Sequence, residues 1–328
     1  MPMTYEVVCL RPEEDFLRVG IVPPETLSIA YLSPDDQQLA AAMAQARALV
    51  IPAVGPKLAP SLFENCAIEL IQVTGAGVDR LDERAMMKLG IAVAKVAGSS
   101  NDAVAEYAVS CALMLLRRIA WADAEIRQGN YSEIRSRMIA ASLPGLADLI
   151  VGVVGLGTIG TAVAEAFHGM GSRIVYYDPI ATSSDATERM AARPLSLREL
   201  LEQADVVTLH MPLIPATEGL IGASELACMK RDAILINAAR GGIVDEAALA
   251  ARLASGDLGG VALDVYSEEP PPSSNPLFAL DGEAARRVLF TPHIAGVTRQ
   301  SWANLFRSAW ENVVRVLDRG EPPLNRVY

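Results

Sequence analysis

Ile150-Val-Gly-Val-Val-Gly-Leu-Gly-Thr-Ile-Gly160 has the pattern of an apolar strand that runs directly into a glycine-rich turn, and a helix to Met170 is predicted to follow. Gly155 allows the tight turn, Gly157 lets the backbone approach a pyrophosphate, and Gly160 lets the helix pack closely on the strand. The free N–H groups of the first helical turn, at Thr158 and Ile159, are suited to hold that anion. The stretch therefore predicts a dinucleotide-binding βαβ unit.

The next predicted strands end in residues that indicate which dinucleotide is bound. The strand at 173–177 is followed by Asp178, which can accept hydrogen bonds from the adenosine ribose hydroxyls and repels a 2′-phosphate. No lysine or arginine follows Asp178 before Arg189, so the sequence favours NAD over NADP. The strand at 206–210 ends in His210-Met-Pro212, which we expect to border the cofactor without taking part in the chemistry.

The whole chain alternates between strand-like and helix-like segments, which is typical of α/β proteins. At roughly 150 residues per domain, its 328 residues predict two domains. Residues 1–100 form one β/α series, which includes a helix expected at 33–47. A long apolar helix is expected at 101–119, a looser segment at 129–146, and a second β/α series from residue 150 onward.

The composition argues against several classes of function. Asp plus Glu number 39 against 28 Lys plus Arg, and the resulting net charge of -11 disfavours nucleic acid as a partner. The four cysteines lie far apart in no zinc-binding spacing, so we expect reduced thiols and no metal site. No signal peptide is visible, and no apolar run reaches the ~20 residues of a membrane helix. We therefore expect a cytoplasmic protein that does not enter the membrane.

Three segments at predicted strand ends supply an arginine, a carboxylate and a histidine. They are Leu235-Ile-Asn-Ala-Ala-Arg240-Gly-Gly, Val261-Ala-Leu-Asp264-Val-Tyr-Ser-Glu268-Glu269-Pro and Leu289-Phe-Thr-Pro-His293-Ile-Ala-Gly. Open α/β sheets bind ligands outside the carboxyl ends of their strands, so all three segments are expected at the cofactor crevice. Arginine grips a carboxylate, histidine moves a proton to or from a developing alkoxide, and a carboxylate beside the imidazole orients it. The trio suits the reduction of a 2-oxo acid, whereas His168, within a predicted helix, is expected to be structural.

In combination, these motifs resemble the D-isomer-specific 2-hydroxyacid dehydrogenase family, from about residue 70 to residue 319 and more loosely before residue 65. The resemblance implies that Arg240, Glu269 and His293 are the catalytic residues, Glu269 being chosen over Glu268 because it precedes the proline. It also implies that Asp264 hydrogen-bonds the nicotinamide carboxamide. The backbone N–H groups of Gly75-Ala76-Gly77 are implied to bind the substrate carboxylate.

The chain departs from the family pattern in two places. Ala94-Lys95-Val-Ala97-Gly98 stands where members usually carry Asn and then Pro-Gly. The segment 129–146, with Arg135 and Arg137, is not typical of the family either, and we expect it to influence substrate preference or to form part of a dimer contact. Neither departure touches the catalytic trio.

The resemblance implies an α/β fold of two Rossmann-like domains. A doubly wound, parallel-sheet NAD-binding domain is expected at 101–299, and a smaller flavodoxin-like substrate domain at 1–100 and 300–328. The implied activity is reversible hydride transfer between nicotinamide and a small 2-oxo or 2-hydroxy acid, with glyoxylate or hydroxypyruvate as the first choice. A homodimer is implied, and the helix from Asn101 is its candidate interface. Residues of both domains are expected to shape the substrate pocket, among them Val54, Tyr107, Arg299 and Trp302.

Two alternatives come from proteins on the same scaffold. Formate enzymes pair the histidine with a glutamine where this chain has Glu269, and the phosphite enzyme carries a lysine where this chain has Ala76. NAD-sensing corepressors keep the trio and dock partner peptides, and a long disordered tail, which is not visible here, would favour that role. Turnover in the absence of a partner protein separates an enzyme from a corepressor.

Overall fold

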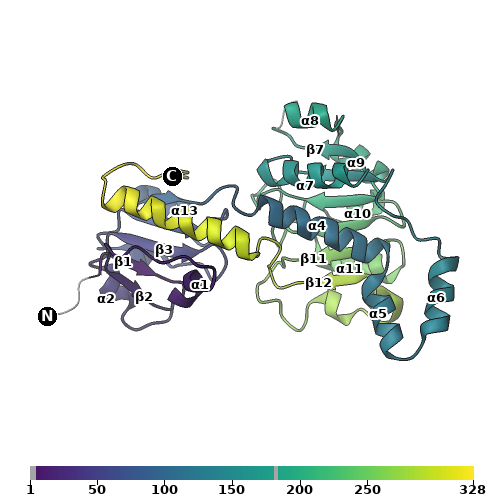
Figure 1. Cartoon of the computed structure of the whole chain (residues 1–328), viewed down its shortest axis with the longest axis horizontal. Coiled ribbons are helices and arrows are strands. Elements are labelled where there is room, and N and C mark those ends of the chain that lie inside the picture. Colours follow the sequence, from purple (N-terminus) through teal and green to yellow (C-terminus); the bar gives the residue numbers. More distant parts are fainter. Residues whose placement is uncertain (1–4, 181–183) are drawn as a thin grey trace. The chain divides into compact units, whose positions relative to one another are not determined.

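The structure, a computed structural model, describes residues 5–180 and 184–328, and the chain divides into two compact units (Figure 1). Unit 1 comprises Met1–Ser100 and Val297–Tyr328, and unit 2 comprises Asn101–Gly296. Each unit is built around its own sheet, and every pairing between the strands named below is parallel. This confirms the predicted α/β class with two Rossmann-like sheets.

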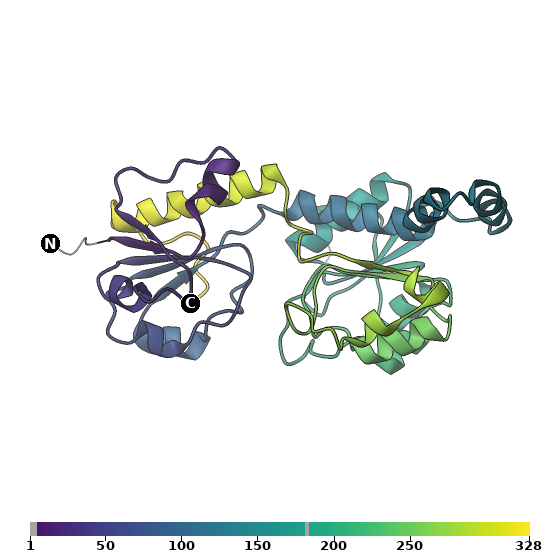
Figure 2. The same ribbon diagram turned by 90° about the horizontal axis from the view of Figure 1, so that it is seen from below.

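Unit 1 has a five-stranded sheet in the order β2-β1-β3-β4-β5, the flavodoxin-like order. The strands are β1 (Val7–Cys9), β2 (Ile29–Tyr31), β3 (Ala48–Pro52), β4 (Leu70–Thr74) and β5 (Ala92–Ala94). Helices cover both faces of this sheet, as the view in Figure 2 shows. One face carries a core with α1 (Glu13–Arg18) and α13 (Arg299–Leu317), and the other carries a core with α2 (Leu39–Met43), η1 (Pro60–Phe63) and α3 (Glu83–Leu89).

Unit 2 has a seven-stranded sheet in the order β12-β11-β10-β9-β6-β7-β8, so the strand order reverses between β6 and β9. The strands are β6 (Ile150–Val154), β7 (Arg173–Tyr177), β8 (Arg193–Pro194), β9 (Val206–Leu209), β10 (Ile234–Asn237), β11 (Gly260–Leu263) and β12 (Val288–Phe290). A reversal of this kind creates a crevice at the carboxyl ends of the two strands, where doubly wound proteins bind nucleotides.

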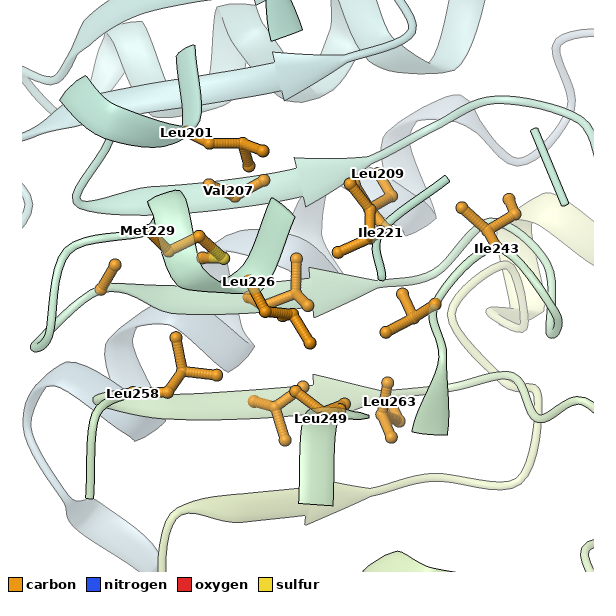
Figure 3. Close-up of a cluster of buried hydrophobic side chains, with 14 of the residues drawn as sticks. Leu201, Val207, Leu209, Ile221, Leu226, Met229, Ile243, Leu249, Leu258 and Leu263 are labelled. Atoms are coloured by element: carbon orange, nitrogen blue, oxygen red, sulfur yellow. The ribbon is translucent and has the colours of Figure 1, made fainter. Parts of the chain in front are cut away.

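Helices pack on both faces of the unit 2 sheet because its strands are apolar on both sides. The core on one face includes α4 (Asn101–Leu116) and α7 (Thr158–Gly169). The core on the other includes α9 (Leu197–Gln203), α10 (Ala223–Cys228) and α11 (Glu246–Ala254). Figure 3 shows Leu201, Leu226 and Leu249 of these three helices among the buried side chains of that second core. Shorter elements are α8 (Asp185–Arg189), η2 (Pro276–Ala279) and α12 (Gly282–Ala285).

Three expected segments differ from the structure. The helix expected at 33–47 is only α2, Leu39–Met43, because the Asp36 carboxylate accepts the N–H of Gln38 at 2.8 Å and holds the preceding residues in a turn. The helix expected at 101–119 ends at Leu116, since Arg118 adopts a left-handed conformation with φ 49°.

The segment from Ile119 to Ala140 forms two further helices, although a looser stretch was expected over much of it. They are α5 (Ile119–Arg127) and α6 (Tyr131–Ala140). Ile134 is the one residue of α6 that is buried, so the apolar periodicity that predicts a helix is missing there.

Candidate active site

The glycine loop of unit 2 lies between β6 and α7, beside the reversal of strand order. Gly155 has φ 92°, and a side chain there would meet the carbonyl oxygen of His210 at 2.7 Å. A side chain at Gly160 would overlap the carbonyl oxygen of Gly155. A Cβ at Gly157 would meet no atom of residues 5–180 or 184–328 within 4 Å, so these residues leave the position open. The loop therefore has the space and the helix N-terminus, from Thr158 and Ile159, that a pyrophosphate needs.

Asp178 joins the end of β7 to the glycine loop. One carboxylate oxygen accepts the N–H of Leu156 at 2.7 Å, and the other accepts the N–H of Ile180 at 2.8 Å. These bonds place a negative charge at the edge of the predicted cofactor crevice, where it disfavours a phosphate group and suits neutral ribose hydroxyls.

His210 follows β9 and lies against the glycine loop through its backbone. Its Nε2 is 2.7 Å from the hydroxyl of Thr208, and its Nδ1 is buried with no hydrogen-bond partner among the described residues. Desolvation lowers the pKa of His210 from 6.5 to about 3, so the ring is neutral at physiological pH. The His210 ring therefore cannot carry a proton to a substrate at neutral pH. Pro212, the other residue expected at this strand end, is exposed.

His293 and Glu269 form the central pair of the site. His293 Nδ1 lies 2.8 Å from Glu269 Oε2, and the two side chains are 26% and 27% exposed. The second oxygen of Glu269 accepts the N–H of Tyr266 at 3.1 Å. Burial alone would raise the pKa of Glu269, but the bond and charge of His293, the Tyr266 N–H and the charge of Arg240 outweigh it and lower that pKa. As a whole residue Glu269 is exposed, and so is the neighbouring Glu268.

Arg240 lies in the turn after β10, close enough for its charge to act on Glu269. Asn237 stabilises this turn, since its amide nitrogen donates to the Arg240 carbonyl at 3.0 Å and its amide oxygen accepts the Ala239 N–H at 3.1 Å. A side chain on Gly241 would overlap the backbone of Tyr266, so this glycine lets the arginine turn and the glutamate loop touch. The arginine and the glutamate are thus positioned by one packed pair of loops.

Asp264 is buried, 1% exposed, and organises the loop that carries His293. Its Oδ1 accepts the hydroxyl of Thr291 at 2.6 Å and the N–H of Ile294 at 2.8 Å. Its Oδ2 accepts the N–H of Ala295 at 2.7 Å. A carboxylate has about four lone-pair positions, so three donors leave room for one more, such as a carboxamide. The sequence indicated no role for Thr291, although Thr291 lies two residues before His293 in the same strand-end segment.

The remaining expected site residues belong to unit 1. Gly75, Ala76 and Gly77 follow the carboxyl end of β4, and a Cβ on Gly75 would meet that of Ala53 at 2.5 Å. The Gly75 carbonyl accepts the N–H of Val96 at 3.0 Å, while Ala76 is exposed. Lys95, the unusual lysine, lines a groove of about 370 Å³ within unit 1 together with Arg315 and Arg319.

Other residues singled out in the sequence lie outside this group. His168 is exposed on α7. Arg137 of α6 lies over the Trp121 ring, 4.5 Å from its centroid, and forms an ion pair with Glu283 at 3.3 Å. Within residues 5–180 and 184–328, no three His, Cys, Asp or Glu side chains are grouped as metal ligands would be. No helix in the described ranges is both long and apolar enough to span a bilayer.

Comparison with known proteins identifies the family of this chain. Residues 109–295 match the model described as "D-isomer specific 2-hydroxyacid dehydrogenase, NAD binding domain". The chain is 33% identical over 260 residues to a glyoxylate reductase of Korarchaeum cryptofilum, an alignment that covers 79% of this chain and 76% of that protein. This chain belongs to the D-isomer-specific 2-hydroxyacid dehydrogenase family. Family membership supports NAD as the cofactor of unit 2.

Further relatives show how widely the D-isomer-specific 2-hydroxyacid dehydrogenases vary in length and substrate. A D-3-phosphoglycerate dehydrogenase of Archaeoglobus fulgidus is 36% identical over 79% of this chain, and the chain spans only 47% of that protein's length. The holo structure of D-mandelate dehydrogenase from Rhodotorula graminis is 25% identical, with a TM-score of 0.84 over 100% of this chain and 98% of that one. The named acids range from glyoxylate to mandelate, so the family alone does not identify the substrate.

Proposed function

We propose that the protein is an NAD-dependent dehydrogenase that interconverts a small 2-oxo acid and the corresponding D-2-hydroxy acid. The reaction is 2-oxo acid + NADH + H⁺ ⇌ D-2-hydroxy acid + NAD⁺. The observation that carries the proposal is the 2.8 Å contact between His293 Nδ1 and Glu269 Oε2, in the same unit as the glycine loop. A histidine–carboxylate pair beside a nicotinamide site is the arrangement that alkoxide protonation requires.

The hydrogen bond between His293 and Glu269 determines which ring nitrogen handles the proton. Glu269 occupies Nδ1, which leaves Nε2 as the nitrogen that would reach the reacting oxygen. The ionised carboxylate stabilises the imidazolium, which gives its Nε2 proton to the carbonyl oxygen during reduction and regains one during oxidation. The bound NAD(H) supplies the hydride donor or acceptor.

Arg240 is proposed to bind the substrate carboxylate and to polarise the carbonyl. A guanidinium suits this task because it donates two parallel hydrogen bonds to a carboxylate and stays charged at all working pH values. The backbone N–H groups of Gly75-Ala76-Gly77, in unit 1, are proposed to bind a carboxylate. Loss of the arginine should raise KM and lower kcat together.

Glyoxylate and hydroxypyruvate are our first choices of substrate. The named activity of the Korarchaeum relative supports the smaller acid, and its alignment covers most of both chains. A panel of 2-oxo acids, from these two through pyruvate to branched, aromatic and dicarboxylic members, tests the choice by NADH consumption, with NADPH run in parallel.

The variant His293→Asn tests the mechanism, and His168→Asn, on the exposed face of α7, is the matched control. We expect His293→Asn to lower kcat by 10²-fold or more, the usual contribution of a general acid, without weakening NADH binding. Near-wild-type turnover in His293→Asn contradicts the assignment. Tight NADH binding with no turnover on any acid favours the NAD-sensing alternative.

We also propose that the protein forms a homodimer. On α4 the exposed residues are polar, whereas α5 and α6 expose Ile126, Tyr131 and Ile139 at 49%, 60% and 61%. These apolar side chains favour the 119–140 segment over the helix from Asn101 as the contact surface. Light scattering coupled to size exclusion tests this, since Ile126→Glu with Ile139→Glu should produce a monomer.

A further inference from the structure

A chain of hydrogen bonds runs from helix α4 to the loop that carries His293. The hydroxyl of Tyr107, on α4, is 2.7 Å from the hydroxyl of Thr291, and Thr291 in turn donates to Asp264 Oδ1 at 2.6 Å. A threonine hydroxyl has a single proton, which is already given to Asp264. Tyr107 is therefore the donor in its bond to Thr291, and the order Tyr107 to Thr291 to Asp264 is settled.

Asp264 receives this chain and holds the backbone on both sides of His293. Its backbone carbonyl accepts the N–H of His293 at 2.8 Å, and its carboxylate accepts the N–H groups of Ile294 and Ala295. His293 itself has φ 55°, a left-handed conformation that residues other than glycine adopt infrequently. These bonds oppose the strain, and they determine the direction in which the imidazole leaves the backbone.

Tyr107 is suited to act as a permanent donor. Burial raises the pKa of Tyr107 well above its usual value, so the hydroxyl keeps its proton over the whole working pH range. The Thr291 carbonyl is bound separately, by the hydroxyl of Tyr266 at 3.0 Å. The structure thus gives Tyr107, expected from the sequence to shape the substrate pocket, a bond to the catalytic loop.

We propose that Tyr107 is a positioning residue for His293 and acts through Thr291 and Asp264. The proposal rests on the proposed function only for its kinetic consequences. Without the tyrosine proton, the Thr291 hydroxyl is held at one end only. The Asp264 carboxylate then loses part of the polarisation that strengthens its hydrogen bonds to the Ile294 and Ala295 N–H groups. The left-handed geometry of His293 becomes less populated, while the NAD-binding glycine loop, on another strand, is unaffected.

The variants Tyr107→Phe and Thr291→Val remove one link each with little change in volume. We expect Tyr107→Phe to lower kcat about 3- to 10-fold and Thr291→Val about 10- to 100-fold, because the second bond goes to a charged group. Because the glycine loop is untouched, NADH affinity should fall less than kcat in both. Thr291→Ser keeps the hydroxyl and should restore most of the activity that Thr291→Val loses. The double variant should be no worse than Thr291→Val alone, since both links belong to one chain.

Tyr131→Phe is the matched control, because the Tyr131 side chain lies on α6 and is 60% exposed. A merely structural role for Tyr107 would lower the melting temperature and leave kcat and its pH profile unchanged. That result, or an equal loss in Thr291→Ser and Thr291→Val, overturns the proposal.

A second measurement is independent of turnover. The chain has three histidines, so the ring signals of His293 can be assigned in an NMR spectrum by comparison with His293→Asn. Tyr107→Phe and Thr291→Val should move the His293 ring signals and leave those of the exposed His168 in place. If the wild-type protein reduces no 2-oxo acid, the proposed function fails, and these shifts still decide the positioning role. Unmoved His293 signals in both variants overturn it.

Discussion

Alanine substitutions at two glycines of the cofactor loop should have opposite consequences. In the part of the chain that the structure describes, a Cβ at Gly157 meets no atom within 4 Å, whereas one at Gly160 overlaps the carbonyl oxygen of Gly155. Gly157→Ala should therefore fold normally, with a free energy of unfolding within about 1 kcal/mol of wild type. We propose that the pyrophosphate binds in this space, so the added methyl group should displace the anion. Displacing the anion from one charge-assisted hydrogen bond costs about 1.5–3 kcal/mol, or roughly 10- to 150-fold in the Kd for NADH.

Gly160→Ala should instead be destabilised by about 1–3 kcal/mol or more, the cost of forcing extra volume into a packed site. Gly169→Ala is the control for both, because Gly169 lies in the last turn of the same helix and its Cβ would meet no described atom within 4 Å. Differential scanning fluorimetry and NADH fluorescence titration give the two readouts. Wild-type NADH affinity in Gly157→Ala, or wild-type stability in Gly160→Ala, would refute the reasoning.

Three further outcomes follow from the site. Glu269→Gln should lower kcat/KM about 10- to 100-fold and change its pH profile, because a neutral amide stabilises the imidazolium poorly. The Kd for NADH should not change. An unchanged pH profile in steady-state kinetics contradicts the pairing with His293. The pKa of His210 is lowered to about 3 in the folded protein, so as the pH falls the unfolded chain binds a proton before the folded chain does. The contribution of the neutral ring to the free energy of unfolding is therefore complete above pH 6.5 and is lost as the pH falls towards 3. Relative to His210→Asn, the wild-type protein should lose about 2 kcal/mol between pH 7 and pH 5 in urea unfolding, while His168→Asn should follow the wild type. Asp178→Ser should raise the kcat/KM for NADPH relative to NADH, and an unchanged ratio would remove Asp178 from cofactor selection.

Much of unit 2 could be predicted from the sequence because its strands are short apolar runs bounded by turn residues. The strands expected at 150–154 and 173–177 are β6 and β7 to the residue. Buried parallel strands carry that signal along their whole length. Helix α6 escaped prediction because it buries little more than Ile134, and a helix held mainly by polar contacts has no apolar stripe to detect.

The residues of the candidate site also divide into those that the sequence predicts and those that it does not. Arg240 and His293 could be singled out because each follows a strand end, and parallel strands bring their ends to one edge. The spacing did not distinguish Glu268 from Glu269, and family resemblance was needed to choose the residue that lies 2.8 Å from His293. Tyr107 and Thr291 are 184 residues apart, so no local pattern signals that their hydroxyls meet.

The sequence by itself determined the glycine loop, the acid after the second strand and the three chemically distinct strand ends. Each of these requirements is local, since a glycine is needed where the backbone must turn or approach, whatever lies elsewhere. Only the tertiary structure decided which acceptor holds which donor. The buried Asp264 receives donors from the histidine loop because the sheet places β11 beside β12. A hydrogen bond depends on tenths of an ångström between side chains on different elements, and packing alone sets those distances.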